Sequence, residues 1–106
     1  MHSREAQTDI LRQFRYLVDL GVPHMASRFK EAVKSTAKEI SNHPNAATPC
    51  QIQNPELLNL RSWPVGGFEA LRIYFLLKHG KMIVIRVLHG KRDNRVILAR
   101  EKLTWN

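Results

Sequence analysis

The chain has 106 residues, of which 43% are hydrophobic and 25% charged, a balance typical of one soluble globular domain. No apolar run approaches the roughly 18 residues of a membrane-spanning helix, and no signal-peptide pattern precedes Ser3. The single cysteine, Cys50, excludes an internal disulfide and is interpreted as an ordinary thiol. We therefore expect one domain over residues 1–106 in a reducing cytoplasm, without a membrane partner.

The formal net charge of +8 is concentrated in the C-terminal part of the chain. Residues 1–60 carry 7 Lys/Arg against 6 Asp/Glu, a net charge of +1, and residues 61–106 carry 10 against 3, a net charge of +7. Such an asymmetry favours an acidic partner, either a nucleic acid or an acidic protein. A solvated basic surface without a partner is the alternative.

Two amphipathic helices are predicted in the N-terminal half. Apolar residues repeat at helical spacing from about Arg4 to Leu20, with Ser3 as N-cap and Gly21 just past the end. Pro23 suits the first turn of a second helix, whose apolar stripe continues to Ile40. The short link between them predicts an α-hairpin.

After a linker over residues 43–56, the apolar period changes from helical spacing to two. We expect strands over Leu57–Trp63, Phe68–Lys78 and Lys81–Leu88, and a short helix within Asn94–Lys102. Consecutive strands joined by short turns form antiparallel sheets. The predicted fold class is therefore α+β, with the α-hairpin packed on a small antiparallel sheet and a short C-terminal helix.

A two-residue turn at His79-Gly80 would fix the register of the last two strands. It pairs Leu76 with Ile83, Tyr74 with Ile85 and Arg72 with Val87. One face then carries Phe68, Ala70, Arg72, Tyr74, Leu76, Ile83, Ile85, Val87 and His89. The other carries Leu71, Ile73, Phe75, Leu77, Met82, Val84, Arg86 and Leu88.

Both predicted faces are apolar, and one α-hairpin covers only one of them. We expect the hairpin over the face of Arg86, which would fix the fold there, and a partner groove on the mixed face of Arg72, Tyr74 and His89. Coverage of the mixed face by the C-terminal helix is the alternative.

A basic cluster follows the last predicted strand, in the segment Arg86-Val87-Leu88-His89-Gly90-Lys91-Arg92-Asp93. Arginines here suit phosphate binding, and His89 beside Tyr74 suits general acid–base chemistry. A histidine with purely structural hydrogen bonds is the alternative. The five histidines show no metal-ligand spacing and no glycine-rich phosphate loop precedes a helix, so we expect no metal and no cofactor.

The segment Arg86–Asp93 resembles the C-terminal signature of ParE-type toxins in the RelE/ParE superfamily of bacterial toxin–antitoxin systems. Ser3–Ile10 resembles the start of that family's first helix, and Leu60–Phe68 resembles the segment that enters its central strands. The resemblance implies a growth-inhibiting toxin held inactive by an antitoxin. ParE-like members imply DNA gyrase as the target, and RelE-like members imply mRNA on the ribosome.

The long α-hairpin and the terminal motif favour a ParE-like toxin that poisons an enzyme without catalysis of its own. The expected residues for binding antitoxin or target are Arg72, Tyr74, His89, Lys91, Arg92 and Arg95. The runner-up is a RelE-like ribosome-dependent endoribonuclease that would use Arg72, Arg86, His89 and Arg92. A third possibility is a basic nucleic-acid-binding module without toxicity.

One departure from the family pattern concerns the first strand. The family usually opens with a β-strand before the first helix, whereas only Met1-His2 precedes Ser3 here. We therefore expect three main strands and an unpaired sheet edge that accepts a strand from another chain.

Overall fold

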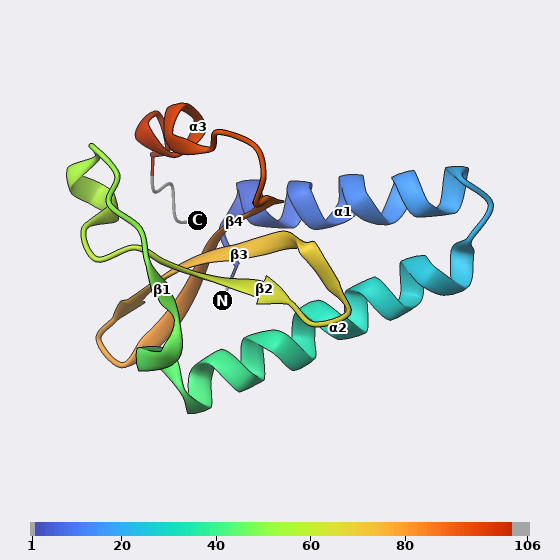
Figure 1. Ribbon diagram of the computed structural model, residues 1–106, viewed down its shortest axis with the longest axis horizontal. Coiled ribbons are helices and arrows are strands. Elements are labelled where there is room, and N and C mark those ends of the chain that lie inside the picture. Colours follow the sequence, from blue (N-terminus) through green and yellow to red (C-terminus); the bar gives the residue numbers. More distant parts are fainter. Residues whose placement is uncertain (1, 103–106) are drawn as a thin grey trace.

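The computed structural model describes residues 2–102 as an α-hairpin packed on one face of a four-stranded antiparallel sheet (Figure 1). The helices of the hairpin are α1 (Arg4–Asp19) and α2 (Pro23–Asn42). The strands are β1 (Thr48–Pro49), β2 (Arg61–Val65), β3 (Phe68–Lys78) and β4 (Lys81–His89), in that order across the sheet. The predicted α+β class is confirmed, as is the short C-terminal helix, α3 (Arg95–Ala99).

The helix ends follow the chemistry predicted for them. The Ser3 hydroxyl caps α1 by accepting a hydrogen bond from the Ala6 backbone N–H at 3.0 Å. Gly21 adopts a φ of +83°, which ends α1, and Pro23 stands in the first turn of α2. The tip of the hairpin extends beyond the sheet along the longest dimension of the molecule (Figure 1).

The predicted strand over Leu57–Trp63 is wrong at both ends. Leu57 closes a 3₁₀ turn, η2 (Pro55–Leu57), which begins where the Asn54 side chain accepts a hydrogen bond from the Glu56 N–H. A second 3₁₀ turn, η1 (Pro44–Ala46), lies earlier in the linker. Strand β2 instead continues through Pro64, because β1 pairs only with Arg61 and Ser62 and leaves no outer neighbour that needs a proline N–H.

The register between β3 and β4 agrees with the prediction only near the turn. Leu76 faces Ile83 as expected, but Tyr74 faces Arg86, because a bulge at Ile85 inserts one extra residue into β4. Beyond that bulge the alternation of β4 is reversed. Val87 packs in the cluster under the helices with Ile73, and Leu88 packs in the opposite cluster, so their predicted faces are exchanged.

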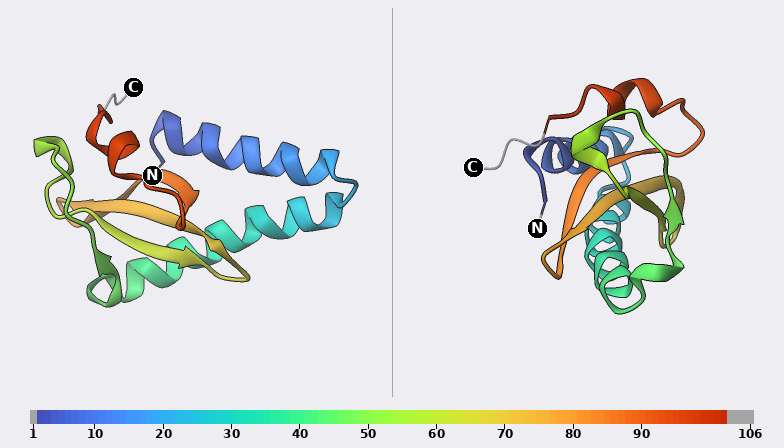
Figure 2. Two further views of the ribbon diagram at one scale, coloured as in Figure 1. Left: turned by 45° about the horizontal axis from the view of Figure 1, so that its top comes forward. Right: turned by 90° about the vertical axis from the view of Figure 1, so that its left-hand side faces the viewer.

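Each face of the sheet has its own apolar core. The helix face buries side chains of α1, α2, β3 and β4, including Phe29, Val33, Ile73 and Phe75. The second face is covered by the segment between β1 and β2 together with α3. Its core comprises Leu57, Leu60, Tyr74, Leu76, Ile85, Leu88 and Leu98. Figure 2 shows α3 and η2 side by side over this face. The open partner groove predicted there is therefore absent in residues 2–102, and the alternative of coverage by the C-terminal helix is correct.

Three main strands are present as predicted, since the fourth, β1, has only two residues. His2 forms an isolated parallel bridge with Val84 at the β4 edge. The Ser3 N–H donates to the Val84 carbonyl at 2.8 Å, and the Ser3 hydroxyl donates to the Ile85 carbonyl at 2.6 Å. The prediction of an unpaired edge is thus wrong over this stretch of β4, where the start of α1 already occupies the backbone groups.

Candidate functional site: the groove between α1 and β4

Arg86 forms a nearly buried ion-pair network that joins both ends of the described chain. Its guanidinium donates to both carboxylate oxygens of Asp9, at 2.7 and 2.9 Å, and to Glu101 at 3.0 Å. The side chains of Arg86, Asp9 and Glu101 are only 16%, 4% and 6% exposed. The hydrogen bond to Asp9 raises the pKa of Arg86 above its usual value, so the guanidinium remains charged. Arg86 therefore stabilises the fold. The bulge at Ile85 pairs it with Tyr74, however, so the prediction that it shares a face with Leu71 and Ile73 is wrong.

Asp9 has a further bond that completes this network. Its carboxylate accepts the backbone N–H of Val87 at 2.9 Å, directly beyond the bulge. One acidic side chain of α1 therefore satisfies both a buried cation and an outward-facing backbone group of β4. Because its oxygens are engaged in these contacts, Asp9 has little capacity to neutralise other cations nearby.

Glu101 gives the network a pH dependence. Burial raises the pKa of Glu101, and this effect outweighs the opposing effect of its hydrogen bond to Arg86. A carboxyl whose pKa is higher in the folded state contributes stability below its unfolded pKa, and that contribution is lost as the pH rises through the folded pKa.

We expect the stability of the wild-type protein relative to Glu101→Gln to fall as the pH rises from about 4 to about 7. Urea unfolding of both proteins across this range measures the difference in free energy of unfolding. Glu39→Gln, an exposed carboxyl on α2, is the matched control and should give a flat difference. A wild-type advantage that grows with pH would contradict the expectation.

Arg72 and His89 lie on opposite faces of the sheet, contrary to the prediction. The Arg72 Nε donates to the Ser62 hydroxyl at 3.0 Å, and its Nη2 reaches the Thr48 hydroxyl at 3.4 Å. His89 pairs with Leu71 across the ladder, on the helix side. The bulge in β4 causes this separation, because it shifts every later residue of that strand by one position.

Tyr74 is buried and faces α3. It is 7% exposed, and its hydroxyl accepts a hydrogen bond from the Asn94 side chain at 2.9 Å. The same Asn94 amide donates to the His89 carbonyl at 2.8 Å, which ties the end of β4 to the start of α3. Tyr74 therefore does not flank the His89 imidazole as an acid–base pair would.

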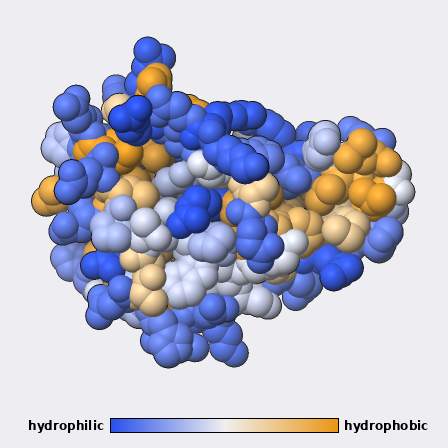
Figure 3. Space-filling view, in the orientation of Figure 1, coloured by the Kyte–Doolittle hydropathy of each residue, from blue (hydrophilic) through white to orange (hydrophobic). Residues whose placement is uncertain are grey.

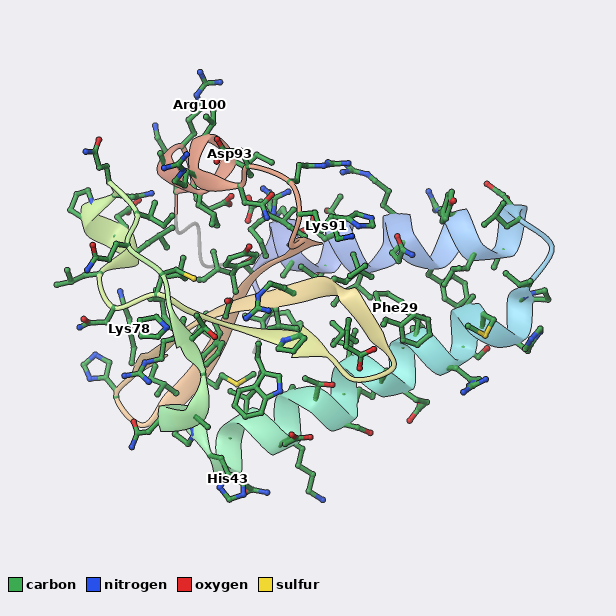
Figure 4. All side chains as sticks on the ribbon, in the orientation of Figure 1. Phe29, His43, Lys78, Lys91, Asp93 and Arg100 are labelled. Carbon is green, nitrogen blue, oxygen red and sulfur yellow. The ribbon has the colours of Figure 1, made fainter. Side chains whose placement is uncertain are left out.

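The predicted residues beyond β4 remain exposed. Lys91 lies at the end of β4 beside α1 (Figure 4), and Arg92 follows it. Arg95 pairs with Asp93 at 3.1 Å, but their side chains are 80% and 62% exposed, so the pair adds little to stability. Within residues 2–102, no group of His, Cys, Asp and Glu is arranged to hold a metal ion.

His89 and Arg92 instead line a groove between α1 and the end of β4, with a volume of about 290 Å³. We call this the α1–β4 groove. Its lining residues are Asp9, Arg12, Gln13, Tyr16, Leu71, Val87, Leu88, His89 and Arg92. Leu71, Val87 and Leu88 supply an apolar surface, whereas Arg12 and Arg92 supply cations from two different elements. Figure 3 shows a largely hydrophilic surface from α3 to the beginning of α1.

Sequence reasoning missed the α1 side of the groove. Asp9, Arg12 and Tyr16 follow one another at intervals of three and four residues, so they lie along one side of the helix. That spacing is visible in the sequence. What the sequence does not reveal is that this side of α1 faces the end of β4, because this depends on how the hairpin packs on the sheet.

The comparisons with known proteins agree with the architecture. The family model described as "ParE toxin of type II toxin-antitoxin system, parDE" matches residues 2–94 of this chain. A comparison with curated proteins gave no significant match. None of the helices described in residues 2–102 is long and apolar enough to cross a membrane. Because the matched range includes most of the chain, from α1 to the basic loop after β4, the protein belongs to the ParE toxin family of type II toxin–antitoxin systems.

Proposed function

We propose that this toxin inhibits DNA gyrase by binding, without catalysis of its own, and that a cognate antitoxin neutralises it in the cytoplasm. Membership of the ParE family supports this proposal, since the family match extends over residues 2–94. The antitoxin partner follows from the type II system to which the family belongs. Gyrase as the target rests on the resemblance to ParE-like rather than RelE-like members.

The arrangement of side chains favours this proposal over an endoribonuclease acting on ribosome-bound mRNA. The nuclease alternative needs Arg72, Arg86, His89 and Arg92 at one centre. Arg86 is committed to Asp9 and Glu101, and Arg72 lies on the other face of the sheet from His89. General acid–base catalysis requires the reacting groups within hydrogen-bond reach of one substrate position. This separation is the observation that carries the choice between the two activities.

The α1–β4 groove is the surface that best suits the antitoxin. It combines an apolar strip with the guanidinium groups of Arg12 and Arg92, so an acidic, partly apolar segment fits both features. Arg72, which we expected to meet the same acidic groups, is held by Ser62 and Thr48 beneath Gly90. Lys91 is exposed and precedes Arg92 in the chain, whereas Arg95 lines a separate hollow between α3 and the linker and is paired with Asp93.

Two assays, one with purified toxin and one in cells, separate the candidate activities. A gyrase supercoiling and DNA-cleavage assay should show inhibition or trapped cleaved DNA, and mapping of mRNA 5′ ends after induced expression should show no new cuts. Transcript cuts with undisturbed supercoiling would favour the nuclease instead. Induced expression without growth inhibition would indicate a binding module that is not a toxin.

Arg92→Glu should weaken antitoxin binding about tenfold, because it replaces a cation of the groove by an anion facing acidic residues. Isothermal titration calorimetry with the cognate antitoxin measures the change. Lys38→Glu, which makes the same charge change at an exposed position on α2, should have a much smaller effect. Equal losses for the two variants would argue against antitoxin binding at this groove.

A further inference from the structure

A second hollow adjoins the α1–β4 groove on the outer side of α1. Its lining residues are Thr8, Leu11, Arg12, Arg15, Tyr16 and Asp19. Arg12 and Tyr16 line both hollows, so these two side chains form the ridge between them. They are four residues apart on the helix, or about 6 Å along its axis, so one ligand of moderate length contacts both.

The charges of the two hollows define where an anion is best held. Arg12 and Arg92 converge on the α1–β4 groove from separate elements, and within residues 2–102 neither guanidinium forms an ion pair. Asp9 lies in the same groove but is already bonded to Arg86 and Val87. Two unpaired cations in one groove repel each other unless an anion lies between them. In the second hollow the negative charge of Asp19 offsets the positive charge of Arg15. The most favourable position for an anion is therefore in the α1–β4 groove, between Arg12 and Arg92.

An aromatic ring stands beside that position. Tyr16 is 55% exposed, so the face of its ring is accessible to a ligand. Gln13 lines the groove as well, and its amide offers both donors and an acceptor. Cations interleaved with an exposed aromatic ring are the pattern of surfaces on which successive phosphates pair with arginine and an unstacked base lies on the ring. An acidic peptide would neutralise the arginines but does not require a planar partner for Tyr16.

We propose that the α1–β4 groove and the Tyr16 ridge bind a single strand of DNA. A backbone phosphate lies between Arg12 and Arg92, and the adjoining base stacks on Tyr16. The choice of DNA rather than RNA rests on the proposed gyrase target, which acts on DNA. The choice of a single strand rests on Tyr16, because only an unpaired base has a face free to stack on the ring. The antitoxin would compete for the same two arginines, so neutralisation of the toxin would also displace the bound DNA.

The test measures binding of a fluorescein-labelled oligothymidylate of about 12 nucleotides to the purified toxin by fluorescence anisotropy. We expect a dissociation constant on the order of 10 μM at low salt. Arg12→Gln and Arg92→Gln should each weaken binding about fivefold. Each should also reduce the slope of log affinity against log salt by about 0.7, the contribution of one phosphate contact on a single strand. Lys38→Gln on α2 is the matched control for charge and should leave the slope unchanged.

Tyr16 provides a second, independent readout. Tyr16→Leu should weaken binding about tenfold without changing the salt slope, because stacking involves no counterion release. Tyr16→Phe retains the ring and should bind as the wild type does. Arg12, Tyr16 and Arg92 are exposed, so the variants are expected to fold, and circular dichroism checks that they do.

The outcomes separate this inference from the proposed function. Absence of oligonucleotide binding, or equal slopes for Arg12→Gln and Lys38→Gln, would overturn the inference even if gyrase is inhibited. Arginine-dependent binding of polyglutamate but not of the oligonucleotide would assign the groove to acidic protein alone. Tighter binding of oligouridylate would overturn the assignment to DNA. Arginine- and tyrosine-dependent DNA binding by a toxin that leaves gyrase unaffected would support the inference while refuting the proposed target.

Discussion

Asp9→Ala should reduce the free energy of unfolding by about 3 kcal/mol, because it leaves the Arg86 cation nearly buried without its main partner. The substitution removes two short contacts to the guanidinium, at 2.7 and 2.9 Å, and the acceptor of the Val87 N–H. Glu101 remains as a partner of Arg86, which limits the loss. Urea unfolding followed by circular dichroism measures the change.

Two further variants show whether the uncompensated charge is the cause. Asp19→Ala removes an exposed carboxylate from the same helix and should cost less than about 0.5 kcal/mol. Asp9→Ala combined with Arg86→Met and Glu101→Gln removes all three charged groups of the network, so this triple variant should be more stable than Asp9→Ala alone. A triple variant less stable than Asp9→Ala would refute this explanation.

Phe29→Ala should be the most destabilising truncation in the helix-face core, at about 4 kcal/mol. Phe29 is fully buried on α2, and its ring meets the Phe68 ring of β3 edge-on, with centroids 5.4 Å apart and an angle of 77° between the planes. Alanine leaves a cavity and removes the aromatic pair together. Thermal and urea unfolding give the loss of stability. Phe29→Leu, which retains most of the volume, should cost about 1.5 kcal/mol. If alanine were tolerated as well as leucine, this core would be less tightly packed than the structure shows.

The sequence predicts local features of this fold well. The helical periodicity, the Ser3 cap and the Gly21 stop are determined by residues close together in the chain, and the structure confirms them. Strand β2, which begins at Arg61 rather than Leu57, shows the limit of local prediction. The Asn54 side chain accepts a hydrogen bond from the Glu56 N–H, and the chain forms a 3₁₀ turn there instead of a strand. Apolar alternation alone does not reveal such a bond.

The candidate site was harder to predict, because one extra residue in β4 reverses which side chains face each side of the sheet. The bulge at Ile85 contains no glycine or proline that would mark it, yet it moves Val87, Leu88 and His89 to the faces opposite those expected. The prediction thus placed His89 with Arg72 when it lies with Arg12 instead. The bulge has a structural partner in α1, since Asp9 binds the residues that follow Ile85. A contact between residues 77 positions apart is not accessible to a reading of local pattern.

The Arg86 network also has a consequence for how the toxin is made. Its guanidinium holds Asp9 near one end of the chain and Glu101 near the other. The ribosome synthesises the chain from its N-terminus, so α1 emerges long before Arg86, and Glu101 emerges after both. Contacts between residues far apart in sequence also slow the search for the native arrangement. Folding of this domain can therefore be completed only after Glu101 has left the ribosome, and until then the growing chain lacks the complete Arg86 network.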